Sequence, residues 1–386
     1  MLRVTPLYGS RWDNSGVSRS GSCTLIEYAD IKVLVDNNNT SASTSSTTAS
    51  TKKSSSESFW ENLPPHDCLV LTDSTLESMG SLPLYDNNDD DTNNTAYMDV
   101  VPPIFATFPT VKMGQMSLYD YHANISLDGC TPSFTLEEMD RAISLIRTIK
   151  YSQTLSLPFP LMEAPPSPFV TITAHMAGHV VGGAFYKFVR LRDETSVVIT
   201  HVYHIARELH LDAATLLRDG SGVDVLITYP GGSASLSKVR RDITERILGL
   251  LRRDANVLLP VDASGRSLEL VLLLDRFWSR NNLSNTFNLV WFGPMVHNTL
   301  EFTRSQLEWM NSVLKQGGDG DFDRGGHPYA LRNVKLCTNL AELEKIISSS
   351  NDNPTCVLAN GLSLDHGPAR DLLLKWSDND NNAILF

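Results

Sequence analysis

Cysteine is scarce in the sequence, and the few cysteines that occur have no regular spacing. The 386 residues include five cysteines, an odd number, and none of them forms a Cys-x-x-Cys pair; they are Cys23, Cys68, Cys130, Cys337 and Cys356. A disulfide framework needs paired cysteines, and a cysteine zinc site needs closely spaced ones. The sequence therefore argues against both and favours a reducing compartment.

A long apolar run is also missing. A membrane-spanning helix needs about 20 consecutive apolar residues, and no segment of the sequence meets this requirement. The first residues, Met1 to Pro6, lack the apolar core of a secretory signal peptide. These absences predict a soluble intracellular protein without a membrane partner.

Positive charge is in the minority. Lys and Arg number 32 against 44 Asp and Glu, which gives a formal net charge of -12. This balance excludes a surface that binds nucleic acid over its whole extent. One local exception is the segment from Lys238 to Arg253, whose cations could contact RNA phosphates. Asp242 and Glu245 dilute its charge, so an ordinary solvated helix face is the simpler interpretation.

Apolar residues are plentiful enough for large cores. They make up 41% of the chain, and a chain of this length is expected to form two or three domains. Two stretches interrupt this composition, residues 37–58, rich in Ser, Thr and Asn, and residues 86–95, rich in Asn and Asp. Such segments cannot bury enough apolar surface to offset the entropy of ordering them. We predict that both are disordered insertions.

Strand and helix patterns alternate along the chain. In the first part, two apolar runs at 23–28 and 31–36 predict a hairpin. Ser74 with Glu77, and Thr135 with Glu138, are spaced as capping boxes and predict helix starts. In the second part, strand-like and helical segments alternate from residue 237 onward, which predicts an α/β domain with a largely parallel sheet.

A histidine turn lies between two core strands of the first part. The run from Val170 to Met176 predicts a strand, and Ala177-Gly178-His179 forms a turn before a second strand. A histidine presented at a strand end by a rigid turn is a candidate metal ligand. Together with His175, His201 and His204 it could build one metal site, although no spacing places these side chains on one centre. Four polar or core-edge histidines are the more frequent outcome.

Several motifs occur in the order found in a known family. These motifs are Met113-Gly114-Gln115-Met116, Tyr119-Asp120, Phe134-Thr135-Leu136, Tyr151-Ser152-Gln153, Ala177-Gly178-His179 with Gly182-Gly183, Val261-Asp262-Ala263-Ser264-Gly265-Arg266 and the run from Glu301 to Met310. In these motifs the sequence resembles the family of subunit 2 of the cleavage and polyadenylation specificity factor, within the metallo-β-lactamase/β-CASP proteins.

The resemblance implies a fold of class α/β. It would comprise a metallo-β-lactamase αββα sandwich, incomplete here, at residues 1–235, and an inserted α/β β-CASP domain at residues 236–386. Chains of the family continue beyond this point and return to the first domain, so this sequence resembles a C-terminally truncated member. We therefore expect exposed apolar surface and poor behaviour of the isolated chain. A cooperative, monomeric unfolding transition would contradict that expectation.

Active relatives bind two zinc ions with a His-x-His-x-Asp-His run. The corresponding positions here are Asp73, Thr75, Glu77 and Ser78, so the imidazoles are missing. Asp73 and Glu77 are instead expected to act as capping and helix-dipole partners. The next ligand histidine corresponds to His179.

The remaining ligand positions of active relatives are also altered. Their bridging aspartate corresponds to Val202, and the acidic motif of their second domain falls on Tyr229. Asp262 is expected to be a turn or cap residue. The resemblance implies no catalytic residue, no metal and no cofactor for this chain, and it leaves the RNA-contacting residues undefined.

By the same resemblance, the chain is expected to be a non-catalytic, nuclease-like scaffold in nuclear pre-mRNA 3′-end cleavage and polyadenylation. Its expected partners are the catalytic endonuclease paralogue and other subunits of that complex, with pre-mRNA as a further candidate. Two alternatives stay open. One is an active metal-dependent RNA endonuclease with a rebuilt histidine site, and the other is the analogous inactive subunit of the Integrator complex.

Overall fold

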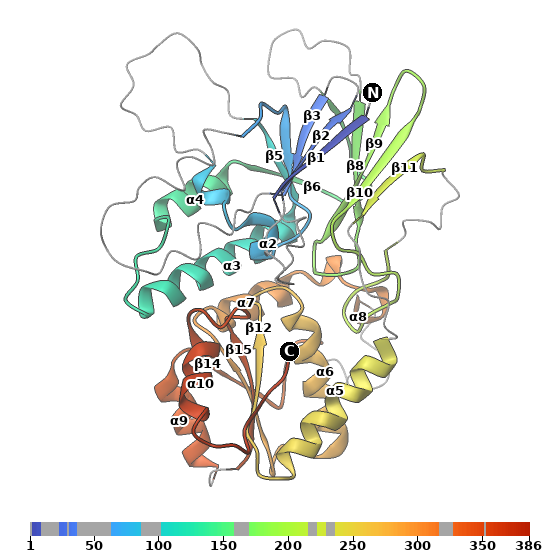
Figure 1. The fold of residues 1–386 in the computed structure, drawn as a ribbon. Helices are drawn as coiled ribbons and strands as arrows, with labels where there is room; N and C mark the ends of the chain where they lie inside the picture. Colours follow the sequence, from blue (N-terminus) through green and yellow to red (C-terminus); the bar gives the residue numbers. More distant parts are fainter. Residues whose placement is uncertain are drawn as a thin grey trace.

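The computed structural model describes most of the chain in two bodies, one above the other in Figure 1. The described residues are 2–8, 23–28, 31–36, 63–85, 102–157, 170–214, 222–228, 236–315, 327–350 and 353–386. The segments at 37–58 and 86–95, for which we predict disorder, lie outside the described residues. Strands β1 to β11 belong to the upper body, and the chain from α5 onward forms the lower body.

The first sheet of the upper body has the order β1-β2-β3-β4-β5-β6. Its first three strands pair antiparallel, which confirms the predicted hairpin, and the others join in parallel. The first three strands are β1 (Leu2–Tyr8), β2 (Cys23–Tyr28) and β3 (Ile31–Val35). The parallel strands are β4 (Cys68–Val70), β5 (Ile104–Thr107) and β6 (Ile146–Ile149).

The second sheet has the order β11-β10-β9-β8-β7 and packs on the first. Apolar side chains of both sheets, among them Val33, Phe105, Ile172 and Tyr186, form one core between them. Its strands are β7 (Thr154–Leu157), β8 (Val170–Met176), β9 (Ala184–Arg190), β10 (Ser196–Thr200) and β11 (Val225–Thr228).

Strand β11 departs from its sequence pattern. Its apolar residues predict a buried strand, but Val225 is 38% exposed and Leu226 is 41% exposed. The prediction of burial is wrong because β11 pairs with β10 alone and forms the edge of the sheet. Apolar composition cannot distinguish an edge strand from a central one.

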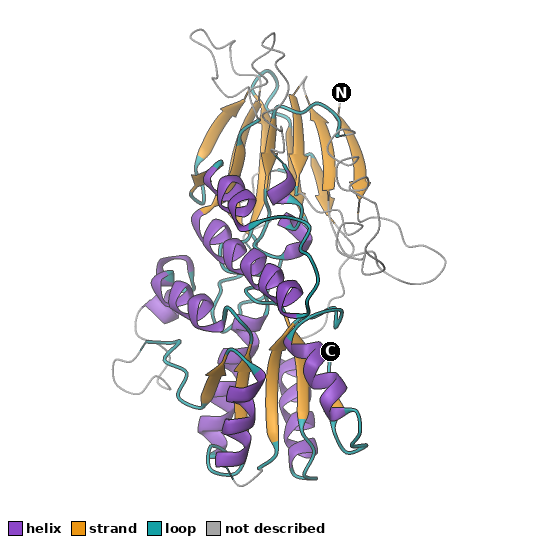
Figure 2. Ribbon diagram, turned by 90° about the vertical axis from the view of Figure 1, so that its left-hand side faces the viewer, coloured by secondary structure: helices purple, strands orange, loops and turns teal. Residues whose placement is uncertain are grey.

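Helices cover the outer face of the first sheet, and Figure 2 shows them in front of its strands. The described part of the upper body is therefore layered as helix, sheet, sheet, in agreement with three layers of the expected sandwich. The elements of this layer are α2 (Leu76–Met79), η2 (Leu82–Leu84), α3 (Phe108–Leu127) and α4 (Leu136–Ser144).

Helix α4 begins as predicted and ends earlier than predicted. Thr135 and Glu138 form the expected capping box, because each side chain bonds the other's backbone N–H. The helical spacing of apolar residues suggests that the helix continues through Ile146 and Ile149, which is wrong. Both isoleucines belong to β6, beside β5. A β-branched segment fits a half-buried strand better than a helix.

The lower body is a parallel sheet of order β14-β13-β15-β12-β16 with helices on both faces, as the sequence predicts. Side chains of α5, α6 and α7 pack on one face and those of α9 and α10 on the other. The strands are β12 (Val257–Val261), β13 (Asn288–Phe292), β14 (Val334–Cys337), β15 (Thr355–Asn360) and β16 (Ala383–Ile384).

The helices of the lower body are α5 (Leu236–Leu251), α6 (Ser267–Asn281), α7 (Val296–Ser305), η3 (Leu307–Trp309), α8 (Ser312–Lys315), α9 (Leu340–Ser349) and α10 (Pro368–Trp376). A single helix over 305–314, as the sequence suggests, is therefore wrong, because the chain turns after Ser305. None of the described helices combines the length and the apolar character that crossing a bilayer requires.

Candidate functional site

Two loops meet where the upper body contacts the lower one. The loop after β4 and the loop after β12 are joined through Ser264, whose hydroxyl lies 2.6 Å from that of Ser117 on α3. Ser117 Oγ also donates to the carbonyl of Ser74, at 2.9 Å. Both loops follow the carboxyl ends of parallel strands, which is where α/β proteins place their binding sites. We call this contact between Ser74, Ser117 and Ser264 the seam. The expected ligand positions lie around it.

The carboxylate of Asp73 accepts hydrogen bonds from a neighbouring residue of its own loop. Its Oδ1 accepts hydrogen bonds from Thr75 N at 2.8 Å and from Thr75 Oγ1 at 2.6 Å. Asp73 thus bonds Thr75, the N-cap residue of α2, and its expected role as a capping or helix-dipole partner stays a prediction. The capping box at Ser74 is wrong, since α2 has Thr75 as its N-cap residue without a side-chain cap. Ser74 contacts Ser117 and Ser264 instead.

Glu77 and Ser78 differ in exposure. Ser78 is fully buried, and its Oγ lies 3.3 Å from Thr72 Oγ1. Glu77 is an exposed residue in the first turn of α2, the position expected of a dipole partner. Protein atoms around its carboxylate desolvate it and raise its pKa; Asp73 adds to this effect, and His201 opposes it.

His179 lies in the turn after β8, as the sequence predicts. Burial lowers the pKa of its imidazole to about 4, and the nearby guanidinium of Arg266 acts in the same direction. Arg266 Nη1 also donates to the carbonyl oxygen of His179, at 3.0 Å. The turn depends on Gly178 and Gly182, whose φ angles of 70° and 81° lie in the left-handed region.

His201 and His204 lie beyond the end of β10, because that strand ends at Thr200. Strand alternation therefore does not determine where these two side chains point. His201 Nδ1 is 3.8 Å from Asp36 Oδ2, and burial lowers the pKa of His201 although Asp73 and Glu77 oppose this. His204 Nδ1 bonds the carbonyl of Ala206, at 2.8 Å.

The remaining expected positions are His175, Val202 and Tyr229. The ring of His175 stacks on Phe185 within the second sheet, with centroids 5.1 Å apart. Val202 is 36% exposed and has an apolar side chain. Tyr229 lies outside the described residues.

Acidic side chains gather at the seam. The pKa of Asp262 is raised to about 6, first by burial and then by the nearby carboxylates of Glu77, Asp73 and Asp120. Of the two roles expected for Asp262, turn or cap residue, the cap is excluded because the N-cap residue of α6 is Arg266, and Asp262 lies in the turn between β12 and α6. The site therefore combines like charges that disfavour one another's ionisation.

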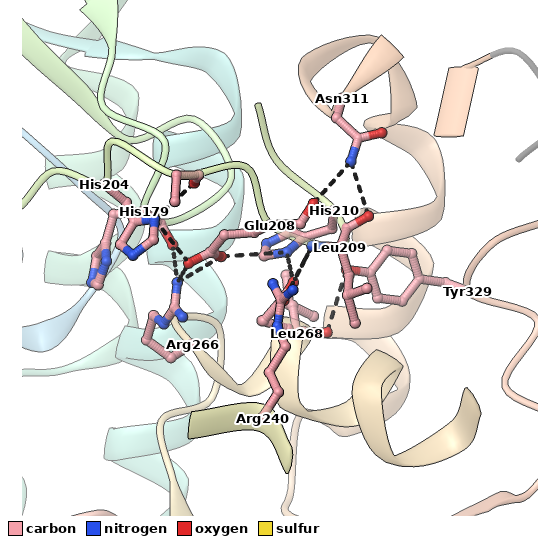
Figure 3. A network of polar contacts seen from close by, with 12 residues as sticks. His179, His204, Glu208, Leu209, His210, Arg240, Arg266, Leu268, Asn311 and Tyr329 are labelled. Atoms are coloured by element: carbon pink, nitrogen blue, oxygen red, sulfur yellow. Dashed lines mark hydrogen bonds and ion pairs between the residues drawn. The ribbon is translucent and has the colours of Figure 1, made fainter. Parts of the chain in front are cut away.

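A charged cluster that the sequence analysis missed lies next to this seam. Among the described residues, Glu208, His210 and Glu269 form the one set of three potential metal ligands whose donor atoms lie within 4.8 Å of one another. All three are buried. Figure 3 shows Glu208 and His210 at the centre of a polar network. His210 Nδ1 lies 2.6 Å from Glu269 Oε2.

Two arginines already balance the charge of this cluster. Arg266 Nη1 donates to both carboxylate oxygens of Glu208, at 2.5 and 2.7 Å. Arg240 Nη2 donates to Glu269 Oε1 at 2.5 Å. The pKa of Glu269 is lowered to about 2, because its bonds to His210, Arg240 and Leu209 outweigh its burial. A divalent cation would place excess positive charge between two guanidinium groups, so the cluster does not fit a metal.

The zinc ions of active relatives do not fit the loop positions either. Asp73 is bonded to Thr75, Ser78 to Thr72, and Val202 has no donor atom. Within the described part of the chain, Asp73, Glu77, His179 and His201 form no set of three donors within 4.8 Å. A zinc ion needs about four donors at bonding distance. The described residues at this seam therefore do not fit a zinc site.

Replacing Asp262 with asparagine should stabilise the protein at high pH. The folded-state pKa of about 6 lies above the ordinary value of 3.8, so the ionised carboxylate costs stability above pH 6 and the cost fades as the pH falls toward 4. We expect Asp262→Asn to raise the free energy of unfolding at pH 8 by on the order of 1–3 kcal/mol, and to have no effect at pH 4. Denaturant titrations at both pH values test this. The exposed Asp378→Asn serves as the control, and an equal gain at both pH values would refute the assignment.

The chain belongs to the metallo-beta-lactamase superfamily, whose domain matches residues 25–229. A Beta-Casp domain follows at residues 267–386. These matches confirm the expected fold class.

The relatives named as subunit 2 confirm the resemblance drawn from the motifs. The probable cleavage and polyadenylation specificity factor subunit 2 of Drosophila melanogaster is 33% identical over 290 residues, which is 73% of this chain and 36% of the relative. The Arabidopsis thaliana subunit 2 is 29% identical over 74% of this chain and 37% of its own length. Integrator complex subunit 11 of Gallus gallus is 24% identical over 83% of this chain and 48% of its own length. The chain spans about a third of the length of the first of these relatives.

Proposed function

We propose that the chain acts as a non-catalytic scaffold in the complex that cleaves and polyadenylates pre-mRNA 3′ ends in the nucleus. Its partners in this role are the catalytic endonuclease paralogue and the other subunits of that complex, and pre-mRNA is a further candidate. The names of the relatives support this assignment, since the subunit 2 proteins of Drosophila and Arabidopsis are more similar to the chain than Integrator subunit 11 is.

The hydrogen bonds within the loop after β4 are the main support for the non-catalytic part of the proposal. A two-zinc nuclease needs several free donors on this loop. Here Asp73 is bonded to Thr75, and Ser78 is buried against Thr72. Tightly held side chains of this kind stabilise the loop and present no open coordination position. The site residues are thus best explained as scaffold positions of an ancestral metal loop.

One observation favours an active endonuclease as the second candidate. The lowered pKa values of His179 and His201 keep both imidazoles neutral at pH 7, which is the form that binds metal. The distances between the potential ligands argue against this candidate. Among the described residues, the two rings, Asp73 and Glu77 provide no three donor atoms within 4.8 Å of one another.

A reconstituted complex tests the proposal directly. The full-length protein containing this chain is combined with the catalytic paralogue and the other subunits, and both pre-mRNA cleavage and bound zinc per subunit are measured. We expect the double substitution Asp73→Ala with His179→Ala to leave the cleavage rate within about twofold, because the proposal assigns neither side chain to a metal or to a catalytic step. A zinc-ligand substitution in the catalytic paralogue is the matched control and should abolish cleavage.

Three results would overturn parts of this proposal. Two zinc ions bound tightly to this chain would contradict the non-catalytic role. A large loss of cleavage in the double variant, with assembly unchanged, would favour the endonuclease. Co-purification of the protein with Integrator subunits in place of polyadenylation subunits would reassign the complex while leaving the scaffold role intact.

A further inference from the structure

Helix α3 belongs to the upper body by packing but reaches into the lower body with its polar side chains. Val111 and Leu118 of α3 are buried in the core between this helix and the first sheet. Asp120, Asn124 and Asp128 follow one another at intervals of four residues, at the C-terminal part and C-cap of the helix. Residues four apart lie on the same face of a helix. This polar stripe faces the carboxyl ends of β13 and β15 and the start of α10.

Asp120 makes the central contact of the stripe. Its buried carboxylate accepts a hydrogen bond from Asn360 Nδ2 at the end of β15, at 2.8 Å. The backbone N–H of Met295, just before α7, donates to the same oxygen at 3.4 Å. Asn360 is fixed in turn, because its Oδ1 accepts from Trp291 Nε1 at 3.2 Å. The carboxylate of one body thus lies among donors of the other.

Asp128 makes a second contact of the same kind at the rim. Its Oδ2 accepts from the backbone N–H of Gly367 at 3.1 Å and lies 3.2 Å from His366 Nδ1. Gly367 is the N-cap residue of α10 and has no side chain to cap that helix. A carboxylate supplied by the upper body therefore accepts from the backbone N–H of the N-cap residue and lies at the positive end of the helix dipole.

The fit around Gly367 is close. A Cβ atom at this position would lie 2.6 Å from Asn124 Cγ, and the φ angle of 76° also favours glycine. Asn124 in turn donates through Nδ2 to Asp120, at 3.0 Å. The three residues of the stripe therefore act together, with Asn124 bridging the central contact and the rim.

We propose that the Asp120–Asn124–Asp128 stripe of α3 is an interdomain lock, which holds the two bodies closed by supplying carboxylates to donors of the lower body. Asp120 contacts the carboxyl edge of the parallel sheet through Asn360 and Met295. In such folds ligands bind at this edge, so the lock converts a ligand-binding edge into a rigid joint. The lock does not depend on the proposed role in RNA processing.

Hydrogen exchange measured by mass spectrometry tests the lock in the full-length protein. In the double variant Asp120→Asn/Asp128→Asn we expect at least about tenfold faster exchange in peptides that contain Met295 and Gly367, because these amides lose charged acceptors. Peptides from β8 and β9 should exchange as in the wild type. The control is Asp140→Asn on α4, an exposed aspartate that accepts a hydrogen bond from the hydroxyl of Tyr119, within the upper body.

Unchanged exchange at Met295 and Gly367 in a folded double variant would overturn the lock. If circular dichroism shows that the double variant is unfolded, the single variant Asp128→Asn decides, since this side chain is 14% exposed at the rim. Faster exchange confined to the start of α10 then supports the lock. Wild-type exchange there, or faster exchange spread over both bodies, refutes it.

Discussion

Replacing Gly178 with alanine should destabilise the protein by about 3–5 kcal/mol. The φ angle of Gly178 is 70°, where an L-residue is strained. An added Cβ would lie 2.7 Å from Ala214 N, 2.8 Å from Asp212 O and 2.9 Å from His204 O. All three are backbone atoms, so no side-chain rotation can relieve the contact. Thermal and denaturant unfolding of the variant measure the loss.

Gly249 is the matched control for this substitution. It lies on α5, and a Cβ added there would meet no atom within 4 Å. Gly249→Ala should therefore stabilise the protein by about 0.5–1 kcal/mol, because alanine is the better helix former. If both variants unfold at the wild-type midpoint, the turn before His179 is not held by backbone contacts as described.

Replacing Glu269 with glutamine should cost a comparable 3–5 kcal/mol, the range expected when one partner of a buried ion pair is removed. Glutamine keeps the size of the side chain but removes the charge that pairs with Arg240 and His210. The backbone N–H of Leu209 also loses a charged acceptor. The free energy of unfolding of the purified variant gives the measurement.

The control for this substitution is Glu301→Gln on α7. Glu301 pairs with Arg304 at 2.6 Å, but its side chain is 71% exposed. Exposed pairs contribute up to about 1 kcal/mol, so this variant should behave almost as the wild type. Equal losses for Glu269→Gln and Glu301→Gln would show that the buried network adds nothing to stability.

Much of the fold could be predicted because local patterns determine it. The hairpin of β2 and β3, the capping box of Thr135 and the parallel sheet of the lower body all follow from signals within short windows. The predictions fail where contacts with residues distant in the sequence determine the secondary structure. Residues 146–149 continue a helical pattern, yet they pair with β5 as a strand, because the edge of that sheet is available to them.

The candidate site was harder to predict than the fold. The positions on the loop after β4 and the histidine turn could be found from their motifs, but their bonding partners could not. Glu208 and His210 lie in an irregular segment without a recognisable pattern, and Glu269 is 59 residues from His210 in sequence. Only the folded chain brings such groups together, and no spacing rule marks them beforehand.

The ion pair between Glu208 and Arg266 also limits which substitutions the protein can accept during evolution. Glu208 comes from the upper body, and its partner Arg266 comes from the loop that leads into α6 of the lower body. The side chain of Glu208 is fully buried, whereas that of Arg266 is 38% exposed, so loss of Arg266 leaves a buried carboxylate without this partner. A substitution of Arg266 therefore favours a compensating substitution of Glu208 in the other body, so the two halves are expected to change together at this pair.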